Sequence, residues 1–326
     1  MKLSKYSFGT GDRFAREGYA QLSAIVEAKK RGVHITPVWN KSYREHQIIG
    51  SSPEEVRIEA DRAVERAGWD EAYFVDADHI GMDNVNYFLA HSDFFTIDVA
   101  DFIGQPADRE AVDTFTEQHG HLLRSVRIEG IAKPFEITEA KMRQVASDFL
   151  VAIDEVHRVY RHIIRQKEQT PVIEVSMDEV ETPQTPVELL LILRMLADRD
   201  VMLDTIALKF SGRFNKGIDY AGDLDQFTRE FEQDLLVIDH AVRTFGLPEQ
   251  LKLSVHSGSD KFLLYRPMRE LINKHDTGLH LKTAGTTWLE ELIGLALSGE
   301  QGLSIVRNIY RQALDRYEEL TGPYTT

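Results

Sequence analysis

Three ionisable residues occur within four positions in the segment Asp76-Ala77-Asp78-His79, which follows a short apolar run at residues 72–75. Two carboxylates and an imidazole at the end of a strand suit metal ligation and proton transfer together. The plain structural alternative is a polar turn with an aspartate that caps the following helix. Asp83 serves as that cap equally well, so the alternative explains little of Asp76 and Asp78. We interpret this segment as part of a catalytic site.

Two further histidines follow predicted strands: His256 in Leu-Ser-Val-His and His280 in Gly-Leu-His-Leu-Lys. Neutral imidazole is the usual nitrogen ligand of a transition metal. A lone histidine at a strand end is more often a hydrogen-bonded core or rim residue. Three such histidines favour one metal site made of His79, His256 and His280, completed by Glu179 or Asp178. This ligand set admits Zn, Mn, Fe, Co or Ni as the divalent metal cofactor.

Glu179 ends a strand of alternating apolar residues at 172–177. An enzyme that inverts a carbon often needs an acid and a base on opposite faces of its substrate. Asp78 and Glu179 follow the third and fifth predicted strands, which a barrel places across its mouth from each other. We therefore predict Asp78 and Glu179 as the catalytic pair. The alternative is that residues 178–181 form a solvated acidic loop.

Basic residues form a third group, in a chain whose net charge of -15 would repel an anionic substrate at long range. Cations gathered at the rim would provide a local pocket for a carboxylate or phosphate. Ser257 and Ser259 flank Gly258 in a turn that can bind an anion through backbone N–H groups. Each cation alone is more often a surface salt-bridge partner. The predicted substrate-binding residues are Arg13, Lys41, Arg44, Lys209, Ser257, Ser259, Lys261 and Lys282.

Short apolar runs alternate with amphipathic runs along the chain, which is typical of βα units. Eight pairs predict an α/β fold, a (β/α)₈ TIM barrel in a single catalytic domain over residues 1–326. A polar, helical stretch at about 108–169 exceeds a minimal unit and predicts an insertion of two or three helices after the fourth strand. The region from residue 286 is predicted to be helical. The predicted strands are residues 5–8, 33–38, 72–75, 95–99, 172–177, 205–209, 251–255 and 279–281.

The composition excludes several classes of function. The chain has 326 residues and no cysteine, so disulfides and thiolate catalysis are excluded. Its acidity argues against sequence-independent binding of nucleic acid. No apolar run has the roughly 18 residues of a membrane span, and the amino terminus lacks an apolar signal core. We expect a cytoplasmic enzyme that acts on a small molecule, and the sequence leaves open whether it forms a homo-oligomer.

Six long motifs carry a family resemblance: GTGDR (9–13), PVWNKSYREH (37–46), FVDADHI (74–80), DFFTID (93–98), SVHSGSDKF (254–262) and HLKTAGTTW (280–288). They resemble the tagaturonate epimerase family over about residues 9 to 290. The resemblance implies a divalent-metal isomerase that interconverts D-tagaturonate and D-fructuronate in hexuronate catabolism. By motif, it implies Asp78 as the base, Glu179 as the acid, and His79, His256 and His280 as metal ligands. Family members are longer, so the resemblance also predicts that this chain lacks one of their segments.

The implied reaction limits the mechanism, because the two sugar acids differ at a carbon one step beyond the neighbour of the ketone. Simple enolisation does not acidify its C–H, so retro-aldol cleavage, rotation and re-addition is a plausible route. Two other interpretations remain. Asp76-Ala77-Asp78 is also the DxD metal motif of nucleotide-sugar glycosyltransferases, and a degenerate barrel could bind a sugar acid without turning it over. The later histidine motifs argue against both.

Overall fold

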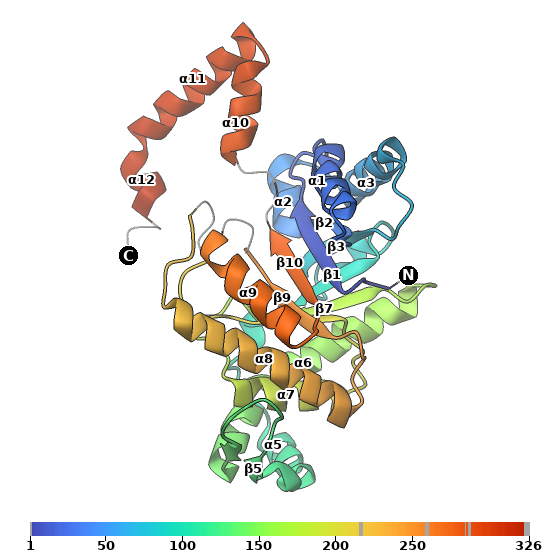
Figure 1. The fold of residues 1–326 in the computed structure, drawn as a ribbon, viewed down its shortest axis with the longest axis vertical. Helices are drawn as coiled ribbons and strands as arrows, with labels where there is room; N and C mark the ends of the chain where they lie inside the picture. The colour runs from blue at the N-terminus through green and yellow to red at the C-terminus, as the bar shows by residue number, and fades with distance from the viewer. Residues whose placement is uncertain (1, 215–217, 258–260, 284, 286–287, 323–326) are drawn as a thin grey trace. The chain divides into compact units, whose positions relative to one another are not determined.

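The computed structural model describes residues 2–214, 218–257, 261–283, 285 and 288–322. It divides into two compact units, Met1–Gly285 and Thr286–Thr326. Eight strands of the first unit pair in parallel into a closed barrel, in the order β1-β10-β9-β8-β7-β4-β3-β2 (Figure 1). The predicted TIM-barrel fold is therefore confirmed. The barrel strands are β1 Tyr6–Gly11, β2 Thr36–Ser42, β3 Phe74–Ile80, β4 Phe94–Asp98, β7 Val172–Ser176, β8 Thr205–Ala207, β9 Lys252–Val255 and β10 Leu279–Thr283.

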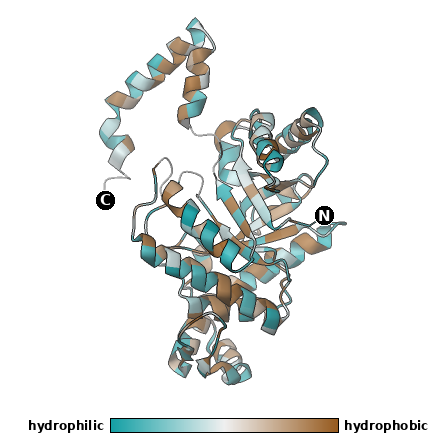
Figure 2. Cartoon of the chain, in the orientation of Figure 1, coloured by the Kyte–Doolittle hydropathy of each residue, from teal (hydrophilic) through white to brown (hydrophobic). Residues whose placement is uncertain are grey.

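Local sequence signals set where the surrounding helices begin and end. Capping boxes open three of them, with Ser42, Ser52 and Thr185 each bonded to a glutamate three residues later. In Figure 2 the helices around the barrel carry hydrophobic and hydrophilic residues in turn, as expected when one helix face is buried. These helices are α1 Gly18–Lys30, α2 Tyr43–Ile49, α3 Pro53–Ala67, α4 Val85–Phe88, α7 Pro186–Asp198, α8 Leu224–Phe245 and α9 Phe262–Lys274.

The stretch predicted as a helical insertion combines three different structures. It contains α5 (Arg109–Gln118), a short 3₁₀ turn at Gly120–Leu122, a two-stranded antiparallel sheet of β5 (Arg124–Val126) and β6 (Phe135–Ile137), and α6 (Glu139–Gln166), and a further 3₁₀ turn at Ala100–Phe102 precedes the stretch. The buried face of α6 joins the same hydrophobic core as β4 and β7. This long helix is therefore the one that connects these two strands along the barrel wall, and the added part is the segment before it.

Several strands extend further than the prediction, and this changes where the polar residues lie. The prediction ends the third strand at residue 75, whereas β3 continues to Ile80. Asp76 and Asp78 pair in register with Asn40 and Ser42 of β2, so they are strand residues and do not follow the strand. A barrel interior places alternate side chains of each strand at its centre, where polar groups can pair with one another. In this segment, the polar residues therefore lie inside the barrel and not after the end of a strand.

The second unit is helical, as the sequence predicted, with α10 Trp288–Leu297, α11 Glu300–Asp315 and α12 Tyr317–Thr321. Among the described residues, no helix has the length and apolar character needed to cross a bilayer. The chemistry-bearing residues considered below all belong to the barrel unit.

Candidate active site

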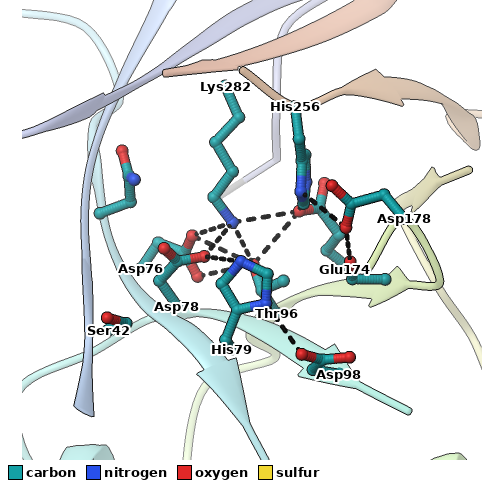
Figure 3. Close-up of polar contacts among 12 residues, drawn as sticks. Ser42, Asp76, Asp78, His79, Thr96, Asp98, Glu174, Asp178, His256 and Lys282 are labelled. Atoms are coloured by element: carbon teal, nitrogen blue, oxygen red, sulfur yellow. Dashed lines mark hydrogen bonds and ion pairs between the residues drawn. The ribbon is translucent and has the colours of Figure 1, made fainter. Parts of the chain in front are cut away.

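A buried lysine forms the centre of the candidate site (Figure 3). The Lys282 ammonium, on β10, lies 2.7 Å from a carboxylate oxygen of Asp76, 2.7 Å from one of Asp78 and 3.2 Å from Glu174 Oε1. It also donates a hydrogen bond of 2.6 Å to Thr96 Oγ1. Buried charges require such pairing because desolvation strongly disfavours an isolated ion. The cluster therefore joins three carboxylates to one cation inside the barrel.

Strand register explains how residues so distant in sequence meet. Thr96 of β4 stands opposite Glu174 of β7, and Glu174 stands opposite Thr205 of β8. Thr205 donates a 2.7 Å hydrogen bond to Glu174 Oε2, and Thr96 donates to Asp76 at 3.0 Å. These hydroxyls satisfy carboxylate oxygens that the lysine does not reach, so the interior is polar and hydrogen-bonded.

Two carboxylates hold the imidazole of His256, which directly follows β9. Its Nε2 lies 2.8 Å from Glu174 Oε1, and its Nδ1 lies 3.2 Å from Asp178 Oδ1 (Figure 3). Burial alone lowers the pKa of His256, but Asp178 and Glu174 outweigh it and raise the pKa to about 10. The ring is therefore a buried imidazolium in this arrangement. A metal ion on either nitrogen would have to displace a carboxylate.

His79 has a different arrangement. Its Nδ1 hydrogen-bonds Asp98 Oδ2 at 3.0 Å, and its Nε2 is 3.7 Å from Asp78 Oδ1. Its backbone φ of +51° lies in the left-handed region, which is costly for a residue other than glycine and is concentrated at functional sites. Ligand atoms of His79, Asp98 and Glu179 all lie within 4.8 Å of one another. Among the described residues, this trio is a group that could hold a metal ion.

Asp76 and Asp78 share one lysine, but their pKa values shift in opposite directions. Burial raises the pKa of Asp76 to about 6 against the opposing pull of Lys282. For Asp78, burial is outweighed by Lys282 and His79, and the pKa falls to about 2. For Glu174, Lys282 and His256 outweigh burial, and its pKa lies well below the usual range. The three carboxylates in turn hold the pKa of Lys282 well above its usual value, against the effect of burial. Asp78 is thus an ionised carboxylate.

Two adjoining cavities open at the carboxyl ends of the strands. The larger measures about 260 Å³ and the smaller about 180 Å³, and both are lined by Glu179, His256 and Ser257. The larger is also lined by Asn40, Ser42, Tyr43, Arg44, Glu45, Asp78, His79, Asn84, Lys282 and Thr283. The smaller adds Asp178, Leu208, Lys209, Phe210 and Phe214. In a TIM barrel, this end of the strands is where catalysis takes place.

The structure places the predicted catalytic pair and two of the three histidines together. Asp78, His79, Glu179 and His256 line the larger cavity, and the His79 and His256 rings lie 5.9 Å apart. His280 is absent from the lining of both cavities. It is fully buried, with Nδ1 2.9 Å from Ser7 Oγ, and burial lowers its pKa to about 3. It lies two positions before Lys282 on the same face of β10, so it is one layer deeper in the barrel.

The predicted substrate-binding cations fall into two groups, those held by other residues and those that border the cavities. Lys41 is buried and donates to the Arg13 carbonyl and, at 2.8 Å, to Ser51 Oγ. Arg13 pairs with Glu45 at 3.3 Å, and the buried Lys261 donates to the Ile218 carbonyl at 2.8 Å. Each of these three cations is therefore held by another part of the barrel unit.

Lys282 lines the larger cavity but is held by its carboxylates. Arg44, Lys209 and Ser257 border the cavities directly, and Ser259 lies outside the described residues. The cavities therefore offer two predicted cations, Arg44 and Lys209, besides the buried lysine.

Sequence reasoning missed Glu174, the residue that joins Lys282 to His256. Its signal was a glutamate in the middle of the strand sequence Val-Ile-Glu-Val-Ser, where a charge is costly unless it is paired. It also missed Asp98, which lies in the fifth residue of β4 and contacts His79. The glycosyltransferase interpretation of Asp76 and Asp78 does not hold, because both carboxylates pair with Lys282 inside an eight-stranded barrel.

Comparison with known proteins finds relatives that match along the length of the chain. A family model described as UxaE, tagaturonate epimerase, matches residues 1–326. The tagaturonate/fructuronate epimerase of Thermotoga maritima is 33% identical over 331 residues, which cover 96% of this chain and 63% of that protein. This chain thus spans less than two thirds of that relative's length.

Crystal structures of the fructuronate-tagaturonate epimerase from Cohnella laeviribosi have the same fold. The form complexed with one glycerol matches with a TM-score of 0.78 at 27% identity, and the native form with 0.77 at 28%. Each match covers 100% of this chain and 66% of the solved chain. By the match along its whole length, the chain belongs to the tagaturonate epimerase family.

Proposed function

We propose that this protein is an epimerase that interconverts tagaturonate and fructuronate, or closely related ketoses, at the cavities of the barrel mouth. The observation that carries the proposal is the ionised, buried Asp78 at the wall of the larger cavity, which His79 and Glu179 also line. A family match alone gives the reaction class, and this constellation supplies groups that can perform it. The whole activity is a proposal because the chain covers 63% of its curated relative.

Asp78 is the proposed base. Its carboxylate lines the cavity, and Lys282 fixes one oxygen at 2.7 Å. A base held in one orientation can accept a hydroxyl proton without first losing side-chain entropy. Lys282 thus positions Asp78, while Glu179, which was predicted as the acid, is exposed at the rim and is proposed below as a metal ligand.

A divalent metal fits the donor set at His79, Asp98 and Glu179 if it displaces the proton of His79, whose pKa is lowered by burial but raised overall to about 9 by Asp78 and Asp98. Metal-bound histidines generally donate their second ring N–H to a carboxylate, and the 3.0 Å contact of His79 Nδ1 with Asp98 has that form. We propose His79 and Glu179 as residues that hold the ion, with Asp98 as a further ligand or as the partner that orients His79. When bound, the ion would polarise the substrate ketone as a Lewis acid. His280 is not proposed as a ligand, and His256 is proposed as a cation beside the substrate.

The proposed chemistry is retro-aldol cleavage followed by re-addition. Asp78 takes the proton of the hydroxyl on the carbon that is inverted, and the carbon–carbon bond toward the ketone breaks. Its electron pair passes into an enediolate, and the inverted carbon becomes an aldehyde. Rotation of the aldehyde and re-addition reverse these steps and return the proton. The imidazolium of His256 and the Lys282 ammonium provide positive charge near the developing enediolate.

The test is incubation of the metal-loaded protein with tagaturonate, fructuronate and the ketoses tagatose and fructose, followed by chromatographic analysis of the sugars. We expect each sugar acid to be converted into the other, and Asp78→Asn to reduce kcat by about 10²–10⁴-fold. Lys133→Met, at an exposed position, is the matched control and should leave the rate unchanged. Conversion that persists in Asp78→Asn, or none in the metal-loaded wild type, contradicts the proposal.

A further inference from the structure

Lys209 and its surroundings form a side chamber that the proposed chemistry leaves without a role. The side chamber is the smaller cavity, of about 180 Å³, and Phe210, Phe214 and Leu208 line it together with Lys209. Complete small-molecule pockets usually measure about 300–1,000 Å³, so each cavity alone is too small, while the two together fall in that range. Because Glu179, His256 and Ser257 line both, the side chamber continues the larger cavity.

We infer that the side chamber is a carboxylate subsite, in which Lys209 binds the acid end of an open-chain sugar acid. This inference rests on the proposed function and adds the direction in which the substrate lies. Its ketone end would face Asp78 and His79 in the larger cavity. Its carboxylate would lie past His256, against the Lys209 ammonium.

The cations of the site favour Lys209 for this role. Lys41, Lys261, Lys282 and Arg13 have the partners described above, whereas Lys209 makes no ion pair with any residue that the structure describes. The backbone N–H of Lys209 donates to Gln184 Oε1 at 2.9 Å, and this hydrogen bond fixes the backbone from which the lysine side chain extends.

Arg44 is the competing cation, and its setting differs. Arg44 is exposed at the rim of the larger cavity, while Lys209 is half-buried among aromatic rings. Surface ion pairs contribute little because water screens them, and partly desolvated pairs contribute more. A carboxylate therefore gains more from Lys209 than from Arg44.

The acidic residues of the side chamber do not cancel this attraction. Asp178 accepts a 2.6 Å hydrogen bond from Ser176 Oγ and lies 3.2 Å from His256 Nδ1, so its charge is already engaged. Glu179 is exposed and belongs to the trio that could hold a metal. The ammonium of Lys209 is the group left to meet an incoming anion.

An anchored carboxylate also serves the proposed retro-aldol route. Cleavage leaves the carboxylate on the aldehyde fragment. This fragment must turn the opposite face of its carbonyl toward the enediolate without leaving the active site. Lys209 would hold this fragment by its carboxylate while the bond beside the new carbonyl rotates. Loss of the anchor should therefore release fragments as well as weaken binding.

The experiment compares Lys209→Met with Arg44→Met on tagaturonate and on tagatose, which has an alcohol in place of the carboxylate. We expect Lys209→Met to lower kcat/KM for the acid on the order of 10–100-fold, mainly through KM, with little change for tagatose. Lys209→Arg should restore part of the loss, and Arg44→Met should change the ratio of the two substrates less than threefold. Equal losses on both substrates, or the acid-specific loss in Arg44→Met, would overturn the inference.

Calorimetric binding of galactonate, with galactitol as the uncharged control, separates this inference from the proposed function. Galactonate bound about tenfold more weakly by Lys209→Met, with galactitol unchanged, supports the subsite even if no epimerisation occurs. Normal epimerisation by wild type with an unaltered acid preference in Lys209→Met refutes the subsite alone. Absence of both turnover and galactonate binding in wild type refutes both.

Discussion

Replacement of Lys282 by methionine tests whether the buried ion cluster holds the barrel interior together. Methionine has a similar length and no charge, so the change removes the cation with little change in volume. It leaves the carboxylates of Asp76, Asp78 and Glu174 inside the barrel without their shared partner. Removal of one partner from a buried ion pair typically costs about 3–5 kcal/mol. We expect a loss of that size at pH 7.

The corresponding change in melting temperature follows from the size of the unit. For a unit as large as Met1–Gly285, the entropy of unfolding is about 0.6 kcal/mol/K, so Lys282→Met should lower the Tm by roughly 5–8 °C. Calorimetry measures this directly, with Lys133→Met as an exposed control that should shift it by less than about 1 °C. A second variant, Lys282→Met with Asp76→Asn, removes one of the stranded charges. It should recover about 1–3 kcal/mol relative to the sum of the single changes.

The pH dependence provides a second readout for the same variant. In wild type, the pKa of Glu174 is depressed, so its contribution to stability is present above its ordinary value near 4.5 and is lost as the pH falls below it. Without Lys282, burial should raise the pKa of Asp76 further above its wild-type value of about 6, and that of Glu174 above its unfolded value. The variant then gains stability as the pH falls through those raised values. The two stability curves should therefore converge on acidification, and a constant gap between pH 8 and pH 5 would refute the reasoning.

Three other predictions concern separate parts of the barrel. Asp98→Asn should weaken divalent-metal binding at His79 by about 10–100-fold, measured by calorimetric titration with Zn²⁺ or Mn²⁺, and unchanged affinity would exclude this pairing. Gly9→Ala should lower stability by about 1–3 kcal/mol, because its new methyl would lie 3.0 Å from Lys282 Cγ; an unchanged Tm would show that the lysine stem can yield. Burial lowers the pKa of His46 to about 4, so its neutral form stabilises the fold above pH 6.5 and this contribution declines down to pH 4. A His46→Gln variant should accordingly lose less stability than wild type over that interval in acid titrations followed by circular dichroism.

The amino-acid sequence by itself determined the fold class and the neighbourhood of the site. Alternation of apolar runs with amphipathic runs is a local property, and it was enough to place eight strands close to their observed positions. Asp78, His79, Glu179 and His256 were found from their places at or near strand ends, and they line one cavity. A closed parallel barrel brings such positions to one end of the molecule whatever lies between them in sequence.

Only the tertiary structure decided which of these residues are free and which are committed to partners. His256 and His280 carry the same local signal, yet one borders the cavity and the other lies a layer deeper against Ser7. That difference depends on how far each strand extends and on the stagger between strands, which local sequence does not encode. The role of Glu174 likewise depends on its contact with Lys282, which is 108 positions away in the sequence. Burial and pairing across the barrel, more than residue type, set the charge of each group and hence the chemistry available to it.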